Sequence, residues 1–245
     1  MITGKCEVDL PMLECEGVIT SRPALSSRHI ESALHFCELS GKIESEYTYE
    51  TITEEKRKQH FAYCINAVTS VYFCFESYIN EFYIDLKFYN KIKNQIITSC
   101  KFWEYLCNKT FWNYIIKKDS LTKYHIALEL CGKPDLDKKA HFYKRITILN
   151  DLRNEIVHSK SRWNNDPYQE HKKILKNLRE QNIGTNPFVF GNDCHFPFEF
   201  ISYSCSKWAV ISCLVFIKKF CEKMNNNFLF DDTLRNLSNE MITYD

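Results

Sequence analysis

The segment FAYCINAVTSVYFCFESYINEFYIDL, residues 61–86, decides the fold class. Its large apolar side chains recur in alternating steps of four and three residues, at Phe61, Ile65, Val68, Tyr72, Phe75, Ile79, Phe82 and Leu86. This spacing places them in one stripe along an α-helix, because residues three and four apart share a face. Thr53 can cap the start, with Glu54 and Glu55 in the first turn. We expect one long helix over about 54–89, which is typical of a bundle of long helices.

The rest of the chain predicts further helices and little β-structure. Six Gly and six Pro in 245 residues are few turn-formers for a sandwich or barrel of short strands, so an all-α fold is favoured. Apolar spacing and capping signals predict helices at about 26–39, 93–117, 121–131, 136–160, from Pro167 onward, and at 198–225. The first of these should stop near Gly41. Residues 183–197 are expected to form a loop insert.

Charge divides the chain into an acidic and a basic part. Residues 1–55 hold 4 Lys+Arg and 11 Asp+Glu, a net charge of −7, so the remainder carries +8. We expect an irregular acidic N-terminal arm over 1–50, a helical domain over 51–230 and a C-terminal tail over 231–245. The basic part suits a polyanion, and a merely solvated surface is the alternative interpretation.

Twelve cysteines raise the question of disulfides or bound metal. No two lie closer than seven residues, so no local Cys-x-x-Cys pair can hold zinc; a site assembled from distant cysteines is the alternative. The most apolar run, 209–217, is far shorter than the roughly 20 residues that cross a bilayer. The N-terminal residues lack the apolar core of a signal peptide. We therefore expect a cytoplasmic protein with reduced thiols, no membrane contact, and no metal or cofactor.

The segment DLRNEIVH, residues 151–158, contains the residue types that metal-free phosphodiester cleavage requires. Arg153 offers a planar fork that can hold a phosphate bidentately. His158 can give and take protons near neutral pH, and Asn154 supplies both a donor and an acceptor. On an ideal helix Arg153 and His158 point about 140° apart, whereas Asn154 and His158 differ by about 40°. Either two chains facing across a two-fold axis or a kink near His158 would bring Arg and His to one phosphate.

This segment resembles the Arg-x4–6-His signature of the HEPN superfamily, in which a polar residue, often Asn, follows the Arg. The earlier helix is also similar to the family's, since Glu76 and Asn80 follow an apolar run as they often do there. The order of Gly132-Lys-Pro134 and a helix ending in Leu-Arg-Asn fits as well. The resemblance covers about 55–225 and leaves the acidic N-terminal residues and the insert unexplained.

The resemblance implies an all-α bundle that acts as an endoribonuclease and forms a symmetric homodimer with the active site at its cleft. His158 would act as base on the ribose 2′-hydroxyl or as acid for the leaving oxygen. Arg153 would hold the scissile phosphate, and Asn154 would orient His158 or the phosphate. The products would be a 2′,3′-cyclic phosphate and a 5′-hydroxyl. Family habits point to a toxin or phage-defence effector, restrained by an antitoxin such as a small nucleotidyltransferase.

Basic residues that follow the motif are candidates for contacts with RNA phosphates. They are Lys160, Arg162, Lys172 and Lys173. A solvated helix face is the alternative for each of them. Two alternatives to the enzyme also stay open: a non-catalytic HEPN-like module that binds RNA, a nucleotide or a partner protein, and a helical interaction bundle in which the motif is accidental.

Overall fold

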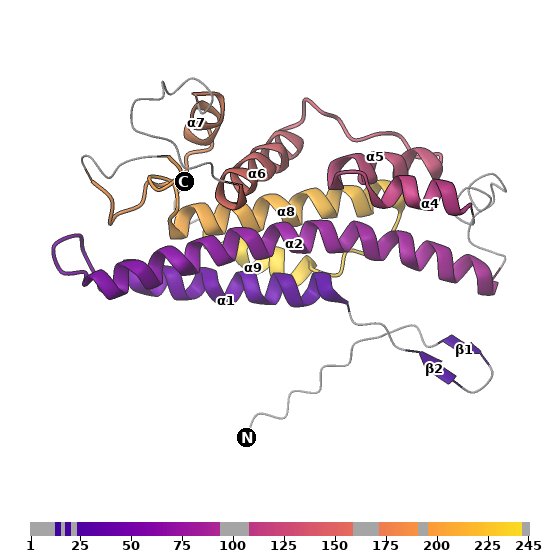
Figure 1. The fold of residues 1–245 in the computed structure, drawn as a ribbon, viewed down its shortest axis with the longest axis horizontal. Coiled ribbons are helices and arrows are strands. Elements are labelled where there is room, and N and C mark those ends of the chain that lie inside the picture. The colour runs from indigo at the N-terminus through magenta and orange to yellow at the C-terminus, as the bar shows by residue number, and fades with distance from the viewer. Residues whose placement is uncertain are drawn as a thin grey trace.

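The computed structural model describes residues 13–15, 18–20, 24–93, 108–158, 172–190 and 196–241 (Figure 1). The helices within these ranges are α1 (Leu25–Glu46), α2 (Glu54–Lys93), α4 (Lys109–Ile116), α5 (Ser120–Leu130), α6 (His141–Val157), α7 (Lys172–Arg179), α8 (Tyr203–Met224) and α9 (Asp231–Met241). A short antiparallel ribbon pairs β1 (Leu13–Cys15) with β2 (Val18–Thr20), with Leu13 opposite Thr20. The bundle is therefore all-helical, as predicted. None of the helices in the described ranges is long and apolar enough to span a membrane.

The 40-residue helix α2 is the axis of the bundle, with α1 along one side and α8 along another (Figure 1). The apolar stripe predicted for it is confirmed. Val68, Phe75 and Ile79 are fully buried, and the outer members of the stripe pack against the same core. Because the stripe is so long, α2 packs against α5 and α6 as well as against α1 and α8. One helix therefore positions the elements that carry the candidate site.

Helix α1 is longer than predicted, because Gly41 does not end it. A Cβ at Gly41 would lie 2.9 Å from the ring of Tyr203, so the glycine is needed for close approach of α8 to α1 rather than as a stop signal. Ile30, Ala33 and Ile43 of α1 are buried. Helix α1 lies within the segment 1–50 that we predict to be an irregular acidic arm, yet it packs as part of the bundle.

Other helix boundaries also differ from the prediction. Helix α6 starts at His141 instead of about 136, because Gly132 (φ 63°) turns the chain after α5 and buried Leu136 anchors an extended link. Helix α8 starts at Tyr203 instead of about 198, where the Ser202 side chain caps it by accepting from the Cys205 amide. The prediction of one helix over 93–117 is wrong where the structure describes it, because Lys93 ends α2 and the extended Asn108 caps a new helix, α4, by accepting from the Thr110 and Phe111 amides. Residues 94–107 lie outside the described residues. The expected C-terminal tail begins with α9.

Candidate active site

Arg153 lies on the part of α6 that faces α2. Its Nη1 donates to Asn154 Oδ1 at 3.0 Å, and its Cζ lies 4.7 Å from the centre of the Tyr72 ring. The Nε–H of Arg153 is buried and has no hydrogen-bond partner in the described part of the chain. Arg57 Nε and Trp208 Nε1 are buried without a partner in the same way, so this unpaired N–H does not by itself mark a ligand site.

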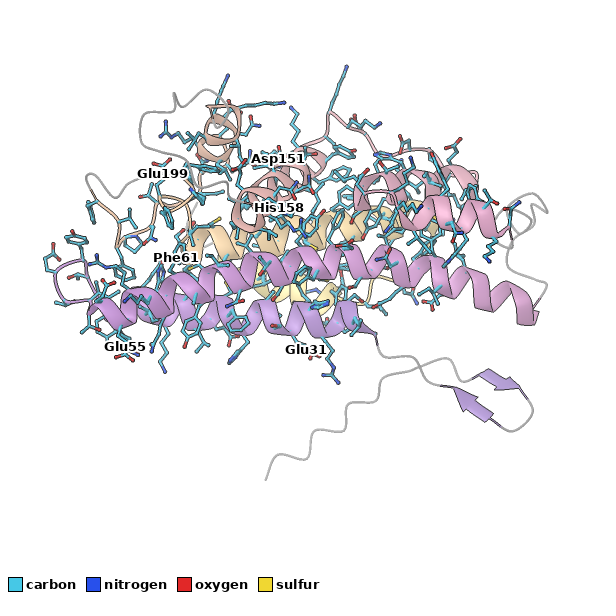
Figure 2. All side chains as sticks on the ribbon, viewed as in Figure 1. Glu31, Glu55, Phe61, Asp151, His158 and Glu199 are labelled. Carbon is cyan, nitrogen blue, oxygen red and sulfur yellow. The ribbon has the colours of Figure 1, made fainter. Side chains whose placement is uncertain are left out.

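His158 caps the C-terminal end of α6 and is exposed (Figure 2). Its backbone N–H still donates to the Asn154 carbonyl at 2.8 Å, but its own φ and ψ (−112° and 22°) have left the helical region. The helix therefore ends at this histidine and has no kink there. The direction of the imidazole is then not fixed as it would be inside an ideal helix, and the side chain is open to a ligand.

Asn154 contacts both of the other predicted catalytic residues. Its side-chain oxygen accepts from Arg153, and its carbonyl accepts from the His158 amide. Among the described residues, no hydrogen bond joins the Arg153 guanidinium directly to the His158 imidazole. Arg153 and Asn154 are thus in direct contact through their side chains, and His158 lies roughly one and a half turns beyond Arg153 on the same helix.

Tyr72 of α2 and Asn150 of α6 form a polar layer behind Arg153. The Tyr72 hydroxyl donates to Asn150 Oδ1 at 2.7 Å, and the ring supports the guanidinium. Burial raises the pKa of Tyr72, and the charge of Glu76 adds to this, whereas a Ser120 hydrogen bond and the Arg153 charge act against it. Tyr72 therefore stays protonated and holds its hydrogen bond near neutral pH. The sequence alone identifies Tyr72 only as a member of the apolar stripe of this helix.

Lys123 of α5 makes a second polar contact with α2, although only 4% of the residue is exposed. Its Nζ donates to Asn80 Oδ1 at 2.9 Å. Burial lowers the pKa of Lys123, opposed by the negative charges of Glu76 and Asp119. Asn80, one of the α2 residues that carry the family resemblance, thus accepts from Lys123, and the charge of the other, Glu76, acts on both Lys123 and Tyr72. Sequence reasoning missed Lys123; a lysine on the buried face of the helix predicted at 121–131 was the available signal.

The basic residues predicted to contact RNA are only partly placed by the structure. Lys173 is exposed on α7, which packs beside α6 (Figure 1). Partial burial raises the pKa of Asp151, and the nearby positive charge of Lys173 opposes that shift. Lys172 begins α7, but its side chain is not described, and Lys160 and Arg162 lie outside the described residues. One of the four predicted cations is therefore located beside the helix that carries the motif.

The donor set at the end of α6 combines a guanidinium, an amide and an imidazole. These groups bind oxyanions and transfer protons, whereas magnesium and calcium prefer carboxylate and carbonyl oxygens. Comparison of the chain with protein-family models, with curated proteins and with solved structures found no match. The chemistry of the site is therefore argued from its own residues.

Proposed function

We propose that this protein is a metal-independent endoribonuclease of the HEPN type, with Arg153, Asn154 and His158 as its active site. The observation that carries the proposal is the hydrogen bond from the Arg153 guanidinium to the Asn154 side chain, which sets the two groups side by side on α6. The exposed His158 follows roughly one turn after Asn154 on the same helix. Phosphodiester cleavage needs the guanidinium and the imidazole at one phosphate.

In the proposed mechanism the imidazole of His158 removes the proton from a ribose 2′-hydroxyl, or donates a proton to the 5′-oxygen that leaves. The 2′-oxygen attacks the adjacent phosphorus, the bond from phosphorus to the 5′-oxygen breaks, and a 2′,3′-cyclic phosphate and a 5′-hydroxyl result. Arg153 neutralises the charge that develops on the phosphate oxygens. Asn154 orients the guanidinium. DNA lacks the attacking hydroxyl, so it should not be cleaved.

A homodimer would give each phosphate both an imidazole and a guanidinium. Val157, next to His158, leaves 45% of its surface exposed. Pairing of two α6 ends about a two-fold axis would cover this valine and place His158 of one copy near Arg153 of the other. The family resemblance extends the proposal to a toxin or phage-defence effector that an antitoxin, such as a nucleotidyltransferase, restrains.

The direct test is cleavage of a structured RNA by the parent protein in the presence of EDTA, with end-group analysis of the products. We expect cleavage that leaves 2′,3′-cyclic phosphates, no cleavage of the DNA of the same sequence, and a mass by light scattering that corresponds to a dimer. Products that carry a 3′-hydroxyl, or cleavage that requires added magnesium, would contradict the mechanism.

The packing of Arg153 favours one alternative, a non-catalytic module that binds RNA, a nucleotide or a partner protein. A guanidinium that lies over the Tyr72 ring and bonds to Asn154 can hold α6 against α2 without taking part in chemistry. This alternative predicts that the parent protein binds RNA with a salt-dependent affinity and leaves the RNA intact over hours.

A further inference from the structure

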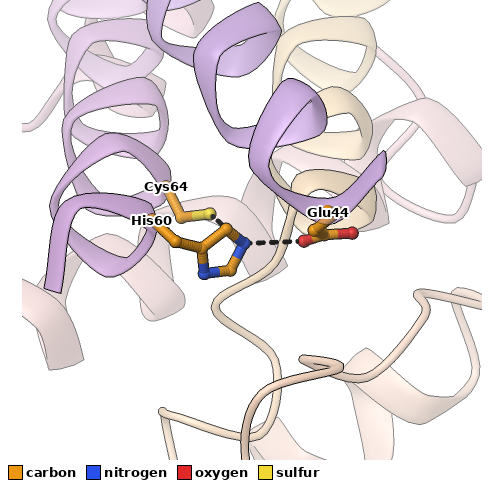
Figure 3. Close-up of side chains that lie close together, drawn as sticks. All are labelled: Glu44, His60 and Cys64. Atoms are coloured by element: carbon orange, nitrogen blue, oxygen red, sulfur yellow. Dashed lines mark hydrogen bonds and ion pairs between the residues drawn. The ribbon is translucent and has the colours of Figure 1, made fainter. Parts of the chain in front are cut away.

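A second cluster of polar side chains lies at the end of the bundle where α1 turns into α2 (Figure 3). Glu44 comes from the last turn of α1, and His60 and Cys64 come from successive turns near the start of α2. His60 is 1% exposed and Cys64 is fully buried, whereas the Glu44 side chain keeps 19% of its surface. Three groups that can ligate a metal are thus held inside the protein, with one of them reaching solvent.

The three groups converge on a single point. Nε2 of His60 lies 2.7 Å from Glu44 Oε1 and 3.5 Å from Cys64 Sγ, and the three ligand atoms all lie within 4.8 Å of one another. In a catalytic Cys–His–acid triad, the nucleophile and the carboxylate bond to different ring nitrogens. Here both face the same nitrogen, so a proton cannot be relayed across the ring from one to the other. Convergence on one centre is what a metal ion requires.

We propose that Glu44, His60 and Cys64 bind a zinc ion. Usual zinc bond lengths give a separation of about 3.5 Å between a nitrogen and a sulfur ligand at tetrahedral angles, which is the observed distance between His60 and Cys64. The corresponding nitrogen–oxygen separation is about 3.3 Å, so the Glu44 oxygen must retreat by about 0.6 Å to admit the ion. Glu44 is the partly exposed ligand, so it has room to do so.

The surroundings of the cluster hold these ligands in place. His60 and Cys64 are four residues apart, so they project from the same face of α2. The backbone N–H of Tyr203 donates to Glu44 Oε1 at 2.7 Å, and the His60 ring meets the edge of Phe188 with centroids 4.8 Å apart. Such outer contacts orient metal ligands and exclude water from them.

The chemical types of the three ligands indicate which metal they would bind. A thiol and an imidazole favour zinc over magnesium or calcium, which prefer oxygen ligands. The protein supplies three ligands, so the fourth position would be filled by a water or by the second oxygen of Glu44, on the side where that residue reaches solvent. A zinc ion there would join the end of α1 to α2 and, through the Glu44–Tyr203 contact, to the start of α8. This stabilising role does not depend on RNA cleavage.

The first experiment measures metal uptake by the full chain. The parent protein, reduced and then dialysed against a slight excess of Zn²⁺, should retain about one zinc per chain by elemental analysis. Cobalt in place of zinc should give a thiolate charge-transfer band and the strong visible bands of tetrahedral coordination. Cys64→Ser should lose the charge-transfer band and most of the metal. Cys213→Ser is the matched control, because Cys213 is equally buried but donates to the Val71 carbonyl instead.

Circular dichroism shows whether each variant is folded, and Glu44→Gln provides a second test if Cys64→Ser is not. The proposal is overturned if the folded parent retains no metal, or if its cobalt spectrum shows no thiolate ligand. It is also overturned if folded Cys64→Ser or Glu44→Gln retains as much zinc as the Cys213→Ser control. RNA cleavage is measured separately in EDTA, and circular dichroism shows whether the protein stays folded once the chelator has removed the metal, so failure of one proposal leaves the other testable.

Discussion

Two histidines of this protein contrast in position, surroundings and suitable chemistry. His158 ends α6, is exposed, and follows a turn that contains Arg153 and Asn154. His60 lies within the second turn of α2, is buried, and is held by Glu44 at 2.7 Å. An imidazole that must exchange protons with a substrate needs access to it, whereas one that ligates a metal needs fixed orientation and dry surroundings. An exposed imidazole at the end of α6 is therefore suited to catalysis, and a buried imidazole near the start of α2 is suited to structure.

The charged groups around the two histidines also differ. The last turns of α6 before His158 carry Arg153 as well as Asp151 and Glu155, and the charge of Lys173 on α7 acts on Asp151. Near His60 the partners are a carboxylate and a thiol, which can ligate a metal. A phosphate held by Arg153 is the ligand proposed for the first site, and a metal ion is the ligand proposed for the second. Substitution of His158 should therefore change the rate of RNA cleavage, whereas substitution of His60 should change the stability of the fold.

The largest effect is expected from His158→Ala. Loss of the proposed acid or base should slow RNA cleavage by about 10²- to 10⁴-fold, measured under single-turnover conditions. The melting temperature should stay close to that of the parent, because the side chain is exposed. His141→Ala, which removes an exposed histidine at the other end of the same helix, should leave the rate unchanged. Equal rates for the two variants would refute the catalytic role of His158.

Arg153→Lys should have the next largest effect. Lysine keeps the charge but loses the planar fork, so we expect cleavage to fall by about 10²- to 10³-fold. The control is Arg145→Lys on the same helix, since Arg145 is engaged by Ser212 and the Trp208 carbonyl away from the motif. That change should lower the melting temperature without changing the rate per folded molecule. If Arg153→Lys behaves in the same way as the control, Arg153 is structural and the binding-module alternative gains support.

His60→Ala should show the opposite behaviour to His158→Ala. Removal of a buried ring leaves a cavity beside Phe188 and deprives Glu44 of a partner, which should lower the free energy of unfolding by roughly 2–4 kcal/mol. Urea denaturation measures this loss. His35→Ala, at an exposed position on α1, should cost less than about 0.5 kcal/mol. RNA cleavage by the folded fraction of His60→Ala should match the parent. A rate loss as large as that of His158→Ala would mean that the His60 cluster and the His158 site are coupled.

The fold was predictable where one pattern extends over many turns. The four–three spacing from Phe61 to Leu86 identified α2, and the capping and turn residues located α5 within one residue at each end. Helix ends were less predictable, because tertiary contacts decide them. Gly41 looks like a stop signal in the sequence, yet it lies inside α1 because the Tyr203 ring, 162 positions later, needs the space.

The two candidate sites also differ in how far apart their residues lie in the sequence. Arg153, Asn154 and His158 lie within six residues, so local spacing and a family resemblance were enough to single them out. The contacts of Tyr72 with Asn150 and of Lys123 with Asn80 join three helices and could not be read from spacing. Glu44 precedes His60 by sixteen residues and meets it only because the α1–α2 turn folds one helix back along the other. A search for paired cysteines could not have found a site that uses a single thiol.

The smallest effect should come from Lys173→Ala. If this exposed lysine contacts an RNA phosphate, its loss should weaken binding a few-fold and reduce the slope of log affinity against log salt concentration by about 0.7. Filter binding at several salt concentrations measures both. Lys58→Ala removes another exposed charge, at the start of α2 and away from α7, so it should leave affinity and slope unchanged. A general effect of net charge would instead lower the slope equally in both variants, and RNA would then have no preference for the site that contains His158.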